Sequence, residues 1–283
     1  MEKNVLCVKN RDARQQYLAQ MLLEDGCQVT LCEEKCRELG EYELVLLPVV
    51  TAKLDLKQMI CQLQKGQRVF GGNLPEFFQD ACMEKGVSCY DYMEEETIAV
   101  KNAVATAEGA IAEAICFSDE TLYGTKVLVT GCGRCGRVLA DRLCGMRCKV
   151  TVLEQEPEKR AIAEISGCRS VQNIEEILTE HTAGKYRFLF NTVPVRIWKE
   201  AALKELPAGM TIIDIASGGG GVDHDYCQCH GIRAKLCPGL PGKYAPKTSA
   251  KILHEYHSLE ILKAKKKSSY KRRSIWRRKK AVK

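Results

Sequence analysis

The segment 126–154 constrains the fold of this chain more than any other, because it places a glycine turn between two strand patterns. An apolar, β-branched run precedes the turn, a helical pattern follows it, and a second β-branched run ends at Glu154. The turn has the spacing G-x-G-x-x-G, given by Gly131, Gly133 and Gly136. Strand, turn, helix and strand in this order predict the βαβ unit that binds the diphosphate of a dinucleotide.

Each glycine has its own expected role in such a turn. Gly131 permits the tight turn, Gly133 lets the diphosphate approach the backbone, and Gly136 lets the helix pack against the strand. The start of the helix offers unpaired N–H groups to phosphate oxygens. The same binding loop also holds Cys132, Arg134 and Cys135. The alternative is a glycine-rich turn in another kind of α/β protein.

Strand and helix patterns alternate on both sides of this segment, which predicts parallel sheets with helices on both faces. At 283 residues the chain is long enough for two domains. The predicted fold is α/β, with two Rossmann-like doubly wound parallel-sheet domains joined by long helices, resembling the 2-hydroxyacid dehydrogenase arrangement. The expected parts are an N-terminal substrate-side domain (1–100), a linking helix (101–118), a dinucleotide-binding domain (119–244), a helix returning to the first domain (245–262) and a basic disordered tail (263–283).

Several single elements are predicted from weaker patterns. They are a strand over 43–49, a helix over 102–117, a helix near 195–203, a surface strand and loop over 224–237, and a last helix over 248–262. A stiff loop with three prolines, residues 237–249, is expected to open that last helix. This loop is either a wall of a ligand site or a simple connection between domains.

Composition favours a soluble globular protein of the cytosol. Hydrophobic residues make up 45% and charged residues 28%. We expect no membrane span, because no apolar run approaches the roughly 20 residues that a span needs. The first residues lack the apolar core of a secretory signal.

The sixteen cysteines are expected to be free thiols, because a reducing compartment and a large core leave no need for a disulfide framework. Cys132 and Cys135 form a C-x-x-C pair, but their place inside the phosphate turn argues against a redox role. A second group fits no zinc-ligand spacing, so no metal is predicted: His224, Cys227, Cys229, His230 and Cys237.

The net charge of +7 belongs to the end of the chain. Residues 263–283 contain twelve Lys or Arg and no acidic residue, so residues 1–262 carry a net charge of −5. With so little apolar content the tail is predicted to be disordered. We do not expect it to bind nucleic acid specifically, since most such runs are solvated extensions.

Ligands of open parallel sheets lie outside the carboxyl ends of the strands. This rule points to the residues that follow two further strands as the remaining walls of the cofactor site. They are Asn191, Thr192, Val193 and Pro194, then Ala216 and Ser217.

A set of short motifs makes the chain resemble a known family. The motifs are 12–15, 47–49, 102–110, 131–136, 191–194, 214–217, 238–242 and 245–248. In combination, and above all in the loop Pro238-Gly-Leu-Pro-Gly242, they resemble the A subunits of dipicolinate synthase, a sporulation enzyme of endospore-forming bacteria. The likeness covers residues 4–262, and the basic tail lies outside it.

The resemblance implies oxidation of a dihydrodipicolinate-type ring to pyridine-2,6-dicarboxylate, with hydride transfer to a nicotinamide cofactor. It also implies a flavoprotein-like B subunit as partner and the mother-cell cytoplasm as location. Whether the chain also forms a homo-oligomer is left open. The family reaction is written with NADP, whereas a carboxylate at Glu154 favours the 2′-hydroxyl of NAD. Because Arg160 could still reach a phosphate, the choice between NAD and NADP stays open.

A small dicarboxylate substrate needs cationic groups in the cleft, and Arg14 suits a bidentate grip on one carboxylate. Lys243 and Lys247 are expected to serve the other. The resemblance motifs add to the expected substrate site Pro48, Asn102, Gly239, Leu240, Pro241 and Gly242. The alternative for Arg14 is an exposed residue of a surface helix.

No pattern in the sequence selects a general base, so the catalytic residue is unknown. The candidates are Glu108, His224, His230, His254 and His257. Two other functions stay open: a regulatory or assembly subunit that binds the dinucleotide without turnover, and an oxidoreductase like the 2-hydroxyacid dehydrogenases.

Overall fold

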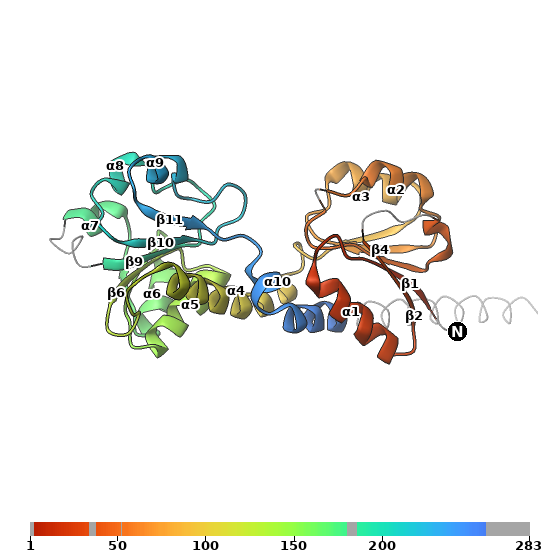
Figure 1. Ribbon diagram of the computed structural model, residues 1–283, viewed down its shortest axis with the longest axis horizontal. Coiled ribbons are helices and arrows are strands. Elements are labelled where there is room, and N and C mark those ends of the chain that lie inside the picture. The colour runs from red at the N-terminus through yellow and green to blue at the C-terminus, as the bar shows by residue number, and fades with distance from the viewer. Residues whose placement is uncertain (1–2, 34–37, 52, 180–185, 259–283) are drawn as a thin grey trace, which may run out of the picture. The chain divides into compact units, whose positions relative to one another are not determined.

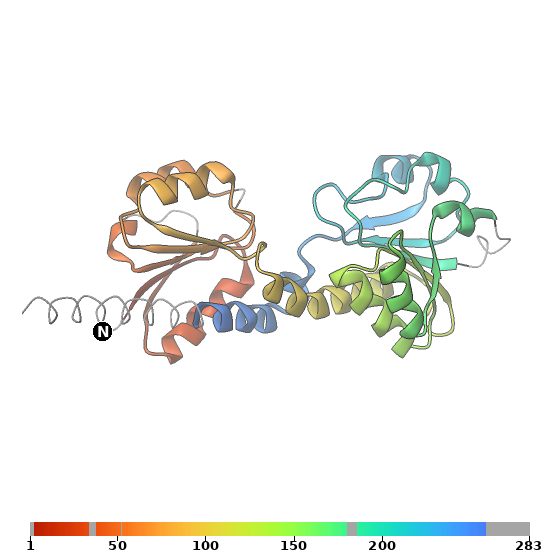
Figure 2. The ribbon, with the colours of Figure 1, turned by 180° about the vertical axis from the view of Figure 1, so that it is seen from behind.

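The computed structural model describes residues 3–33, 38–51, 53–179 and 186–258. The chain divides into two compact units, each built on its own parallel sheet (Figures 1 and 2). One unit takes the described residues of Met1–Ile98 together with those from Pro246 onward, and the other is Ala99–Ala245. The predicted fold class, two α/β domains with parallel sheets, is confirmed.

The first unit has a five-stranded sheet with the order β2-β1-β3-β4-β5. The strands are β1 (Asn4–Val8), β2 (Gln28–Cys32), β3 (Leu44–Leu46), β4 (Arg68–Gly71) and β5 (Ser88–Asp91). The helices are α1 (Ala13–Glu24), α2 (Leu56–Gln62) and α3 (Glu76–Glu84), with a 3-10 turn η1 (Leu39–Glu41). The strand order reverses between β1 and β3, which makes the carboxyl ends of these strands the expected ligand edge of this unit.

Helices cover both faces of this sheet. Phe78 of α3 and Val69 of β4 are fully buried on the face under α2 and α3. On the other face, Leu18 of α1 packs with Phe70 and with Leu253, which belongs to a helix over residues 246–258. The inner strands β1, β3 and β4 are buried on both faces, which explains why their sequences are mostly apolar, whereas the edge strands β2 and β5 are partly exposed.

The second unit has a six-stranded sheet with the order β11-β10-β9-β6-β7-β8. The strands are β6 (Lys126–Thr130), β7 (Lys149–Leu153), β8 (Arg169–Val171), β9 (Tyr186–Asn191), β10 (Thr211–Asp214) and β11 (Arg233–Leu236). Numbered from β6, this is the order 3-2-1-4-5-6 of dinucleotide-binding sheets, with its reversal between β6 and β9.

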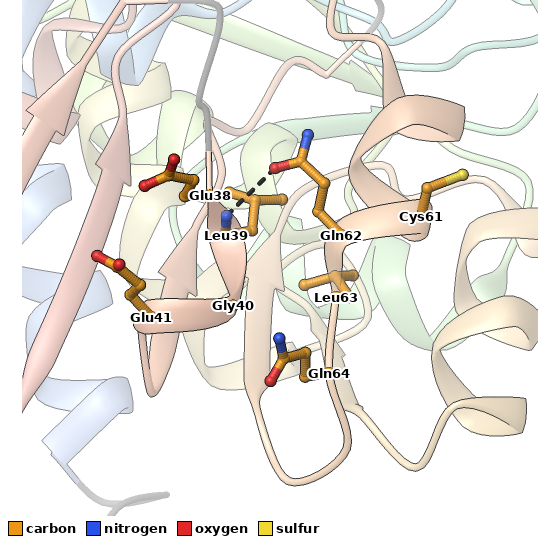
Figure 3. Close-up of a pocket in the computed structure, with 8 residues that line it drawn as sticks. All are labelled: Glu38, Leu39, Gly40, Glu41, Cys61, Gln62, Leu63 and Gln64. Atoms are coloured by element: carbon orange, nitrogen blue, oxygen red, sulfur yellow. Dashed lines mark hydrogen bonds between the residues drawn. The ribbon is translucent and has the colours of Figure 1, made fainter.

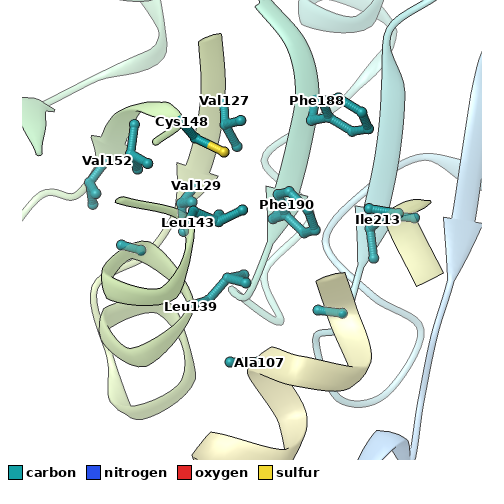
Figure 4. Close-up of a cluster of buried hydrophobic side chains, with 14 of the residues drawn as sticks. Ala107, Val127, Val129, Leu139, Leu143, Cys148, Val152, Phe188, Phe190 and Ile213 are labelled. Carbon is teal, nitrogen blue, oxygen red and sulfur yellow. The ribbon is translucent and has the colours of Figure 1, made fainter. Parts of the chain in front are cut away.

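The helices of this unit also lie on both faces of the sheet (Figure 1). They are α4 (Glu96–Phe117), α5 (Arg134–Gly145), α6 (Pro157–Ile165), α7 (Ile174–Thr179), α8 (Glu200–Leu203), α9 (His224–Cys229) and α10 (Leu240–Tyr244). Figure 4 shows the core on the side of α4 and α5, where Phe190 of β9 points toward Leu139 of α5. Phe188 of β9 and Ala107 of α4 belong to the same buried cluster. Alanine at this place lets α4 lie close to the strands.

Two predicted elements of the second unit are wrong. Helix α8 starts at Glu200 instead of residue 195, because Trp198 is fully buried in extended backbone that pairs with Val222. Its indole Nε1 donates to Thr130 Oγ1 at 2.9 Å. The segment 224–237, expected to be a surface strand and a loop, begins instead with helix α9 and continues into strand β11. The Asp223 side chain caps α9 by accepting from Tyr226 N at 3.1 Å.

The proline loop also contains a helix that no sequence pattern indicated. Helix α10 follows Gly239, whose φ of 69° is left-handed, and it has Pro241 in its first turn. The next helix starts at Pro246, two residues earlier than predicted, and the predicted end at 259–262 lies outside the described residues. The remaining differences are in length: α4 begins six residues before Asn102, and β3 covers only Leu44–Leu46 of the expected 43–49.

The prediction of free thiols is confirmed for fourteen cysteines and wrong for Cys32, which is disulfide-bonded. Burial raises the pKa of the thiols of both Cys132 and Cys135, which keeps these C-x-x-C residues in the less reactive thiol form. Among the described residues, no three His, Cys, Asp or Glu side chains gather as a metal site would require. In the same part of the chain, no helix has the length and apolar content to cross a bilayer.

Candidate dinucleotide-binding site

The glycine turn has the geometry expected of a diphosphate-binding loop. Gly131 has a φ of 87°, and a Cβ there would lie 2.7 Å from Thr192 Oγ1 and from Val193 Cγ2. A Cβ at Gly136 would collide with the carbonyl oxygen of Gly131. Nothing lies within 4 Å of a Cβ at Gly133, so open space adjoins the backbone where a diphosphate would approach. The space around each glycine is what the three predicted roles require, while the binding of a diphosphate stays a prediction.

Helix α5 begins directly at this turn. Gly133 is its N-cap, and no side chain caps the helix. Because the first N–H groups of a helix have no carbonyl partner within it, this end presents donors and a partial positive charge to an anion.

Glu154 follows β7 and supports the turn from the adjacent strand. Its Oε2 accepts from Cys132 N at 2.8 Å, and its Oε1 accepts from Glu156 N at 3.0 Å. These two bonds hold the carboxylate at the edge of the binding loop, where a ribose hydroxyl would meet it.

The basic residues near Glu154 already have partners. Arg160 Nη1 donates to the carbonyl oxygens of Glu154 and Gln155, at 3.1 and 2.6 Å. Lys159 Nζ lies 2.6 Å from Glu156 Oε1. Both groups are thus engaged on the side of the loop where the 2′-phosphate of NADP would have to be neutralised.

A cavity of about 590 Å³ opens beside the turn, entirely within the second unit. Four segments line it. They are the end of β6 with Gly131, the end of β7 with Glu154, the loop after β8 and the start of α7 with Asn173 and Ile174, and the loop after β9 with Val193 and Ile197. Apolar side chains opposite a carboxylate suit an adenine ring with its ribose.

Asn191 and Thr192, predicted as walls, hold the site together through their side chains. Asn191 is fully buried, and its Nδ2 donates to Val193 O at 3.0 Å and to Asp214 Oδ1 at 2.8 Å. Thr192 Oγ1 donates to Thr130 O at 2.8 Å. Val193 lines the cavity, and Pro194 is exposed beside it.

A buried carboxylate at the end of β10 was not among the residues predicted from the sequence. Asp214 has no exposed surface, and four N–H groups donate to its two oxygens at 2.8–3.1 Å. The donors are Asn191 Nδ2 and the backbone N–H groups of Ala216, Gly221 and Val222. Asp214 opens the motif 214–217 that contributes to the resemblance, and it ends an apolar strand that four glycines in a row follow closely.

Asp214 also contacts a histidine. His224, the first residue of α9, places Nε2 at 3.2 Å from Asp214 Oδ2, and its side chain is 24% exposed. Ala216 is buried next to this pair, and Ser217 is exposed. The predicted wall 216–217 is therefore anchored by the same carboxylate that contacts His224.

The other candidate bases lie in different surroundings. His257 is buried in the first unit with Nε2 at 2.7 Å from Tyr92 Oη, and burial, with a smaller effect of His254, lowers its pKa to about 3. His254 pairs with Asp25 in that unit, at 2.8 Å. His230 is exposed and stacks on Tyr226, with ring centroids 3.9 Å apart, and Glu108 is exposed on α4.

Arg14 lies at the ligand edge of the first unit and is largely buried. Its Nε and Nη2 bind both oxygens of Asp12, at 2.7 and 2.8 Å, and Asp12 also accepts from Val49 N at 3.3 Å. The alternative of an exposed helix residue is thus excluded. Next to it, Pro48 O accepts from Gly72 N at 3.3 Å, so the loops after β1, β3 and β4 meet here.

The residues expected from the proline loop divide between core and surface. Leu240 is buried in the core of the second unit, where α4 approaches it at Gly109. Lys243 Nζ pairs with Glu113 of α4 at 2.5 Å, and Lys247 is exposed in the first unit. Gly239 and Gly242 lie at the start and inside of α10, on either side of Pro241. Asn102 of α4 has a buried Oδ1 without a hydrogen-bond partner among the described residues.

Two further hollows lie in the first unit. The cavity in Figure 3, about 670 Å³, is lined by Glu38–Glu41 and Cys61–Gln64, and Gln62 Oε1 accepts from Leu39 N. These segments precede β3 and β4, so this cavity is at the amino ends of the strands, away from the ligand edge. A third cavity, about 580 Å³, lies at the carboxyl ends between Thr51, Leu54 and Phe77.

Comparison with protein families agrees with the site geometry. Residues 97–226 match the model described as D-isomer specific 2-hydroxyacid dehydrogenase, NAD binding domain. This range contains the glycine turn, Glu154, Asp214 and His224. The second unit is therefore a nicotinamide-dinucleotide-binding domain by strand order, by turn geometry and by sequence.

Two relatives carry the resemblance inferred from the motifs. The dipicolinate synthase A subunit of Bacillus subtilis (strain 168) is 31% identical over 185 residues, which are 65% of this chain and 61% of that protein. The match thus spans less than two thirds of that relative. The crystal structure of the dipicolinate synthase A subunit from Bacillus halodurans matches with a TM-score of 0.81 and 26% identity, over 92% of this chain and 97% of that one. The chain is similar to these A subunits in sequence and in fold, as predicted.

A more distant likeness concerns the fold alone. The apo-structure of D-lactate dehydrogenase from Escherichia coli matches with a TM-score of 0.65 and 16% identity, over 92% of this chain and 97% of that one. The predicted arrangement of two domains resembling the 2-hydroxyacid dehydrogenases is confirmed at this level.

Proposed function

We propose that this chain oxidises a dihydrodipicolinate-type ring to dipicolinate, with NAD bound in the second unit as hydride acceptor. The observation that carries the proposal is the intact glycine turn at the strand-order reversal, combined with the likeness to dipicolinate synthase A subunits. A dehydrogenase-type domain supports redox chemistry on a small molecule. The name of the relatives, dipicolinate synthase, indicates the ring compound.

The residues present fit a nicotinamide dinucleotide. The turn from Gly131 to Gly136 and the start of α5 would hold the diphosphate. Glu154 would bind the adenosine ribose. The cavity beside it, lined by both apolar and polar side chains, would take the adenine. When bound, the cofactor supplies hydride-accepting chemistry, while the chain orients the groups and excludes water.

We favour NAD over NADP as the cofactor. The carboxylate of Glu154 is held at the ribose position, and it would repel a 2′-phosphate. Two cations close to Glu154 are already engaged: Arg160 with carbonyl oxygens and Lys159 with Glu156. Arg196 and Lys199 line the cavity farther along, in the segment after β9.

The substrate side is proposed to lie at the ligand edge of the first unit. Asp12 fixes two nitrogens of Arg14, which orients the guanidinium for a substrate carboxylate. Pro48 and Lys247 are further candidates in this unit, and Asn102 and residues 239–243 are separate candidates in the second unit. A flavoprotein-like B subunit is the proposed partner, and the mother-cell cytoplasm the proposed location, both by resemblance.

Formation of reduced nicotinamide from freshly generated dihydrodipicolinate tests the function. We expect the absorbance of reduced nicotinamide to grow in proportion to the dipicolinate formed, with or without the B-type partner. Binding of NADH without turnover in either condition would favour a regulatory role. Oxidation of simple 2-hydroxy acids, and not of the ring, would favour a 2-hydroxyacid dehydrogenase.

A further inference from the structure

We infer that His224, oriented by Asp214, accepts the proton that the ring loses during its oxidation; this rests on the proposed function. Five residues are candidates for this role from the sequence alone. The structure distinguishes His224 by its contact with Asp214, by the tautomer that this contact implies, and by its place relative to the expected nicotinamide.

Asp214 imposes one tautomer on His224. Both oxygens of Asp214 accept N–H groups, so the carboxylate acts as an acceptor toward all its neighbours. His224 Nε2, at 3.2 Å from Oδ2, must then carry the hydrogen and donate it. A neutral ring in this state has its lone pair on Nδ1, which is the atom that can accept a proton.

The contact with His224 is not needed to satisfy Asp214. The carboxylate already has two N–H donors on each oxygen, close to its full capacity. The imidazole adds a fifth contact while 24% of its side chain stays exposed. A base oriented by a buried carboxylate is a recurring arrangement for proton transfer.

The position of His224 also favours this role. Glu154 and the cavity beside β7 assign the adenosine half of the cofactor to one side of the strand-order reversal. The nicotinamide half then belongs to the carboxyl ends of β9 and β10. Asp214 ends β10 and accepts hydrogen bonds from Ala216 N and from His224. The same carboxylate therefore contacts both His224 and the predicted nicotinamide wall at residues 216–217.

The oxidation releases one proton, for which His224 is the proposed acceptor. In aromatisation, one ring C–H bond breaks with its electron pair leaving as hydride to the nicotinamide. A neighbouring C–H bond leaves its electron pair in the ring and releases a proton, which Nδ1 of His224 accepts. The products are dipicolinate, reduced cofactor and a protonated imidazole, which then loses its proton to water.

Other charged groups surround this histidine. Asp214 faces the ring from β10, and Asp223 and Asp225 flank it in sequence. Arg196, from the loop after β9, lies 3.9 Å from Asp223 Oδ2 and offsets that charge.

The test compares His224→Gln with His230→Gln in the full chain. Both residues belong to the α9 segment, but His230 is exposed and stacks on Tyr226, so it is the matched control. We expect kcat to fall about 100- to 10,000-fold in His224→Gln and to change little in His230→Gln. NADH affinity should be equal in the three proteins. The low-pH decline of kcat should vanish in His224→Gln, and added imidazole should restore part of the rate of His224→Ala.

A labelling experiment gives a readout that does not depend on turnover. Diethyl pyrocarbonate should modify His224 and His230 in the free protein, and NADH should protect His224 alone. Wild-type turnover with undiminished kcat in His224→Gln, or no protection by NADH, would overturn the role of His224 and leave the proposed oxidation intact. Absence of turnover in the wild type, with NADH bound, would overturn both.

Discussion

At the scale of single residues, the proposed cofactor site depends on a few atoms, each with a proposed role. At Gly131 and Gly136 a side chain would collide with the backbone or with Thr192. At Gly133 a side chain would fit, but it would fill the open space that a diphosphate would need. Glu154 joins the turn to the next strand. These tasks could be predicted from spacing, because the G-x-G-x-x-G turn has one geometry wherever it occurs between a strand and a helix.

The choice of cofactor is a prediction about Glu154. Wild type should bind NADH at least about tenfold more tightly than NADPH, since a 2′-phosphate beside this carboxylate costs about 1.4 kcal/mol or more. Glu154→Gln should narrow this ratio, because it removes the repulsion. Fluorescence titration with both reduced cofactors measures it, and equal or reversed preference in the wild type would refute the assignment.

Arg14 gives a second prediction at this scale. Arg14→Lys keeps a positive charge next to Asp12 but loses the planar, bidentate fork. We expect the KM for the ring to rise about 10- to 100-fold, the range for a lost hydrogen bond to a charged group. The Kd for NADH should stay unchanged. Equal effects on KM and on NADH binding would remove Arg14 from the substrate site.

At the scale of elements, α4 and the β11–α10 segment are joined by a buried carboxylate. Glu113 of α4 is almost fully buried and pairs with Lys235 of β11 at 2.7 Å and with Lys243 of α10. Burial alone would raise the pKa of Glu113, but hydrogen bonds from Lys235, Lys243 and Tyr244 lower it to about 2. The proline loop is therefore fastened to the core of its own unit.

This lowered pKa predicts a pH dependence of stability. A carboxylate with a depressed folded pKa stabilises the protein above its ordinary value of 4.5, and this stabilisation is lost as the pH falls towards about 2. Glu113→Gln should lower the free energy of unfolding at pH 7 and weaken its dependence on pH between these values. Urea unfolding measures both.

Glu108→Gln, on the exposed side of the same helix, is the control for this experiment. It should leave the free energy of unfolding nearly unchanged across the pH range. If the two variants behave alike, the paired lysines contribute nothing to the stability of the unit.

The elements that were not predicted from the sequence have identifiable causes. Residues 195–199 have a helical pattern, but burial of Trp198 and its bond to Thr130 keep them extended. Helix α9 was not predicted, because its cysteine-containing sequence was interpreted as a surface strand and loop, although Asp223 is a good N-cap. Asp214 and His224 are ten residues apart in a glycine-rich stretch, so only the folded loop reveals that they touch.

At the scale of the whole molecule, the fold class followed from alternation alone, because strand and helix patterns that alternate allow few other solutions. The two sheets have different strand orders, and each order places one reversal, hence one ligand edge, in its unit. The glycine turn lies at the reversal of the second sheet, and Arg14 lies near that of the first. The division of labour between a cofactor unit and a substrate unit is the proposal that joins these facts.

The most direct test of this division is the binding of NADH to the full chain carrying Gly133→Val. A side chain at this position meets no atom within 4 Å, and the φ of −72° suits any residue, so the fold and melting temperature should be retained. We predict saturable NADH binding in the wild type and a loss of affinity of about 100-fold or more in the variant, about 2.7 kcal/mol. Equal affinity in the two proteins would show that the diphosphate does not bind at this turn, and would contradict the assignment of the cofactor site.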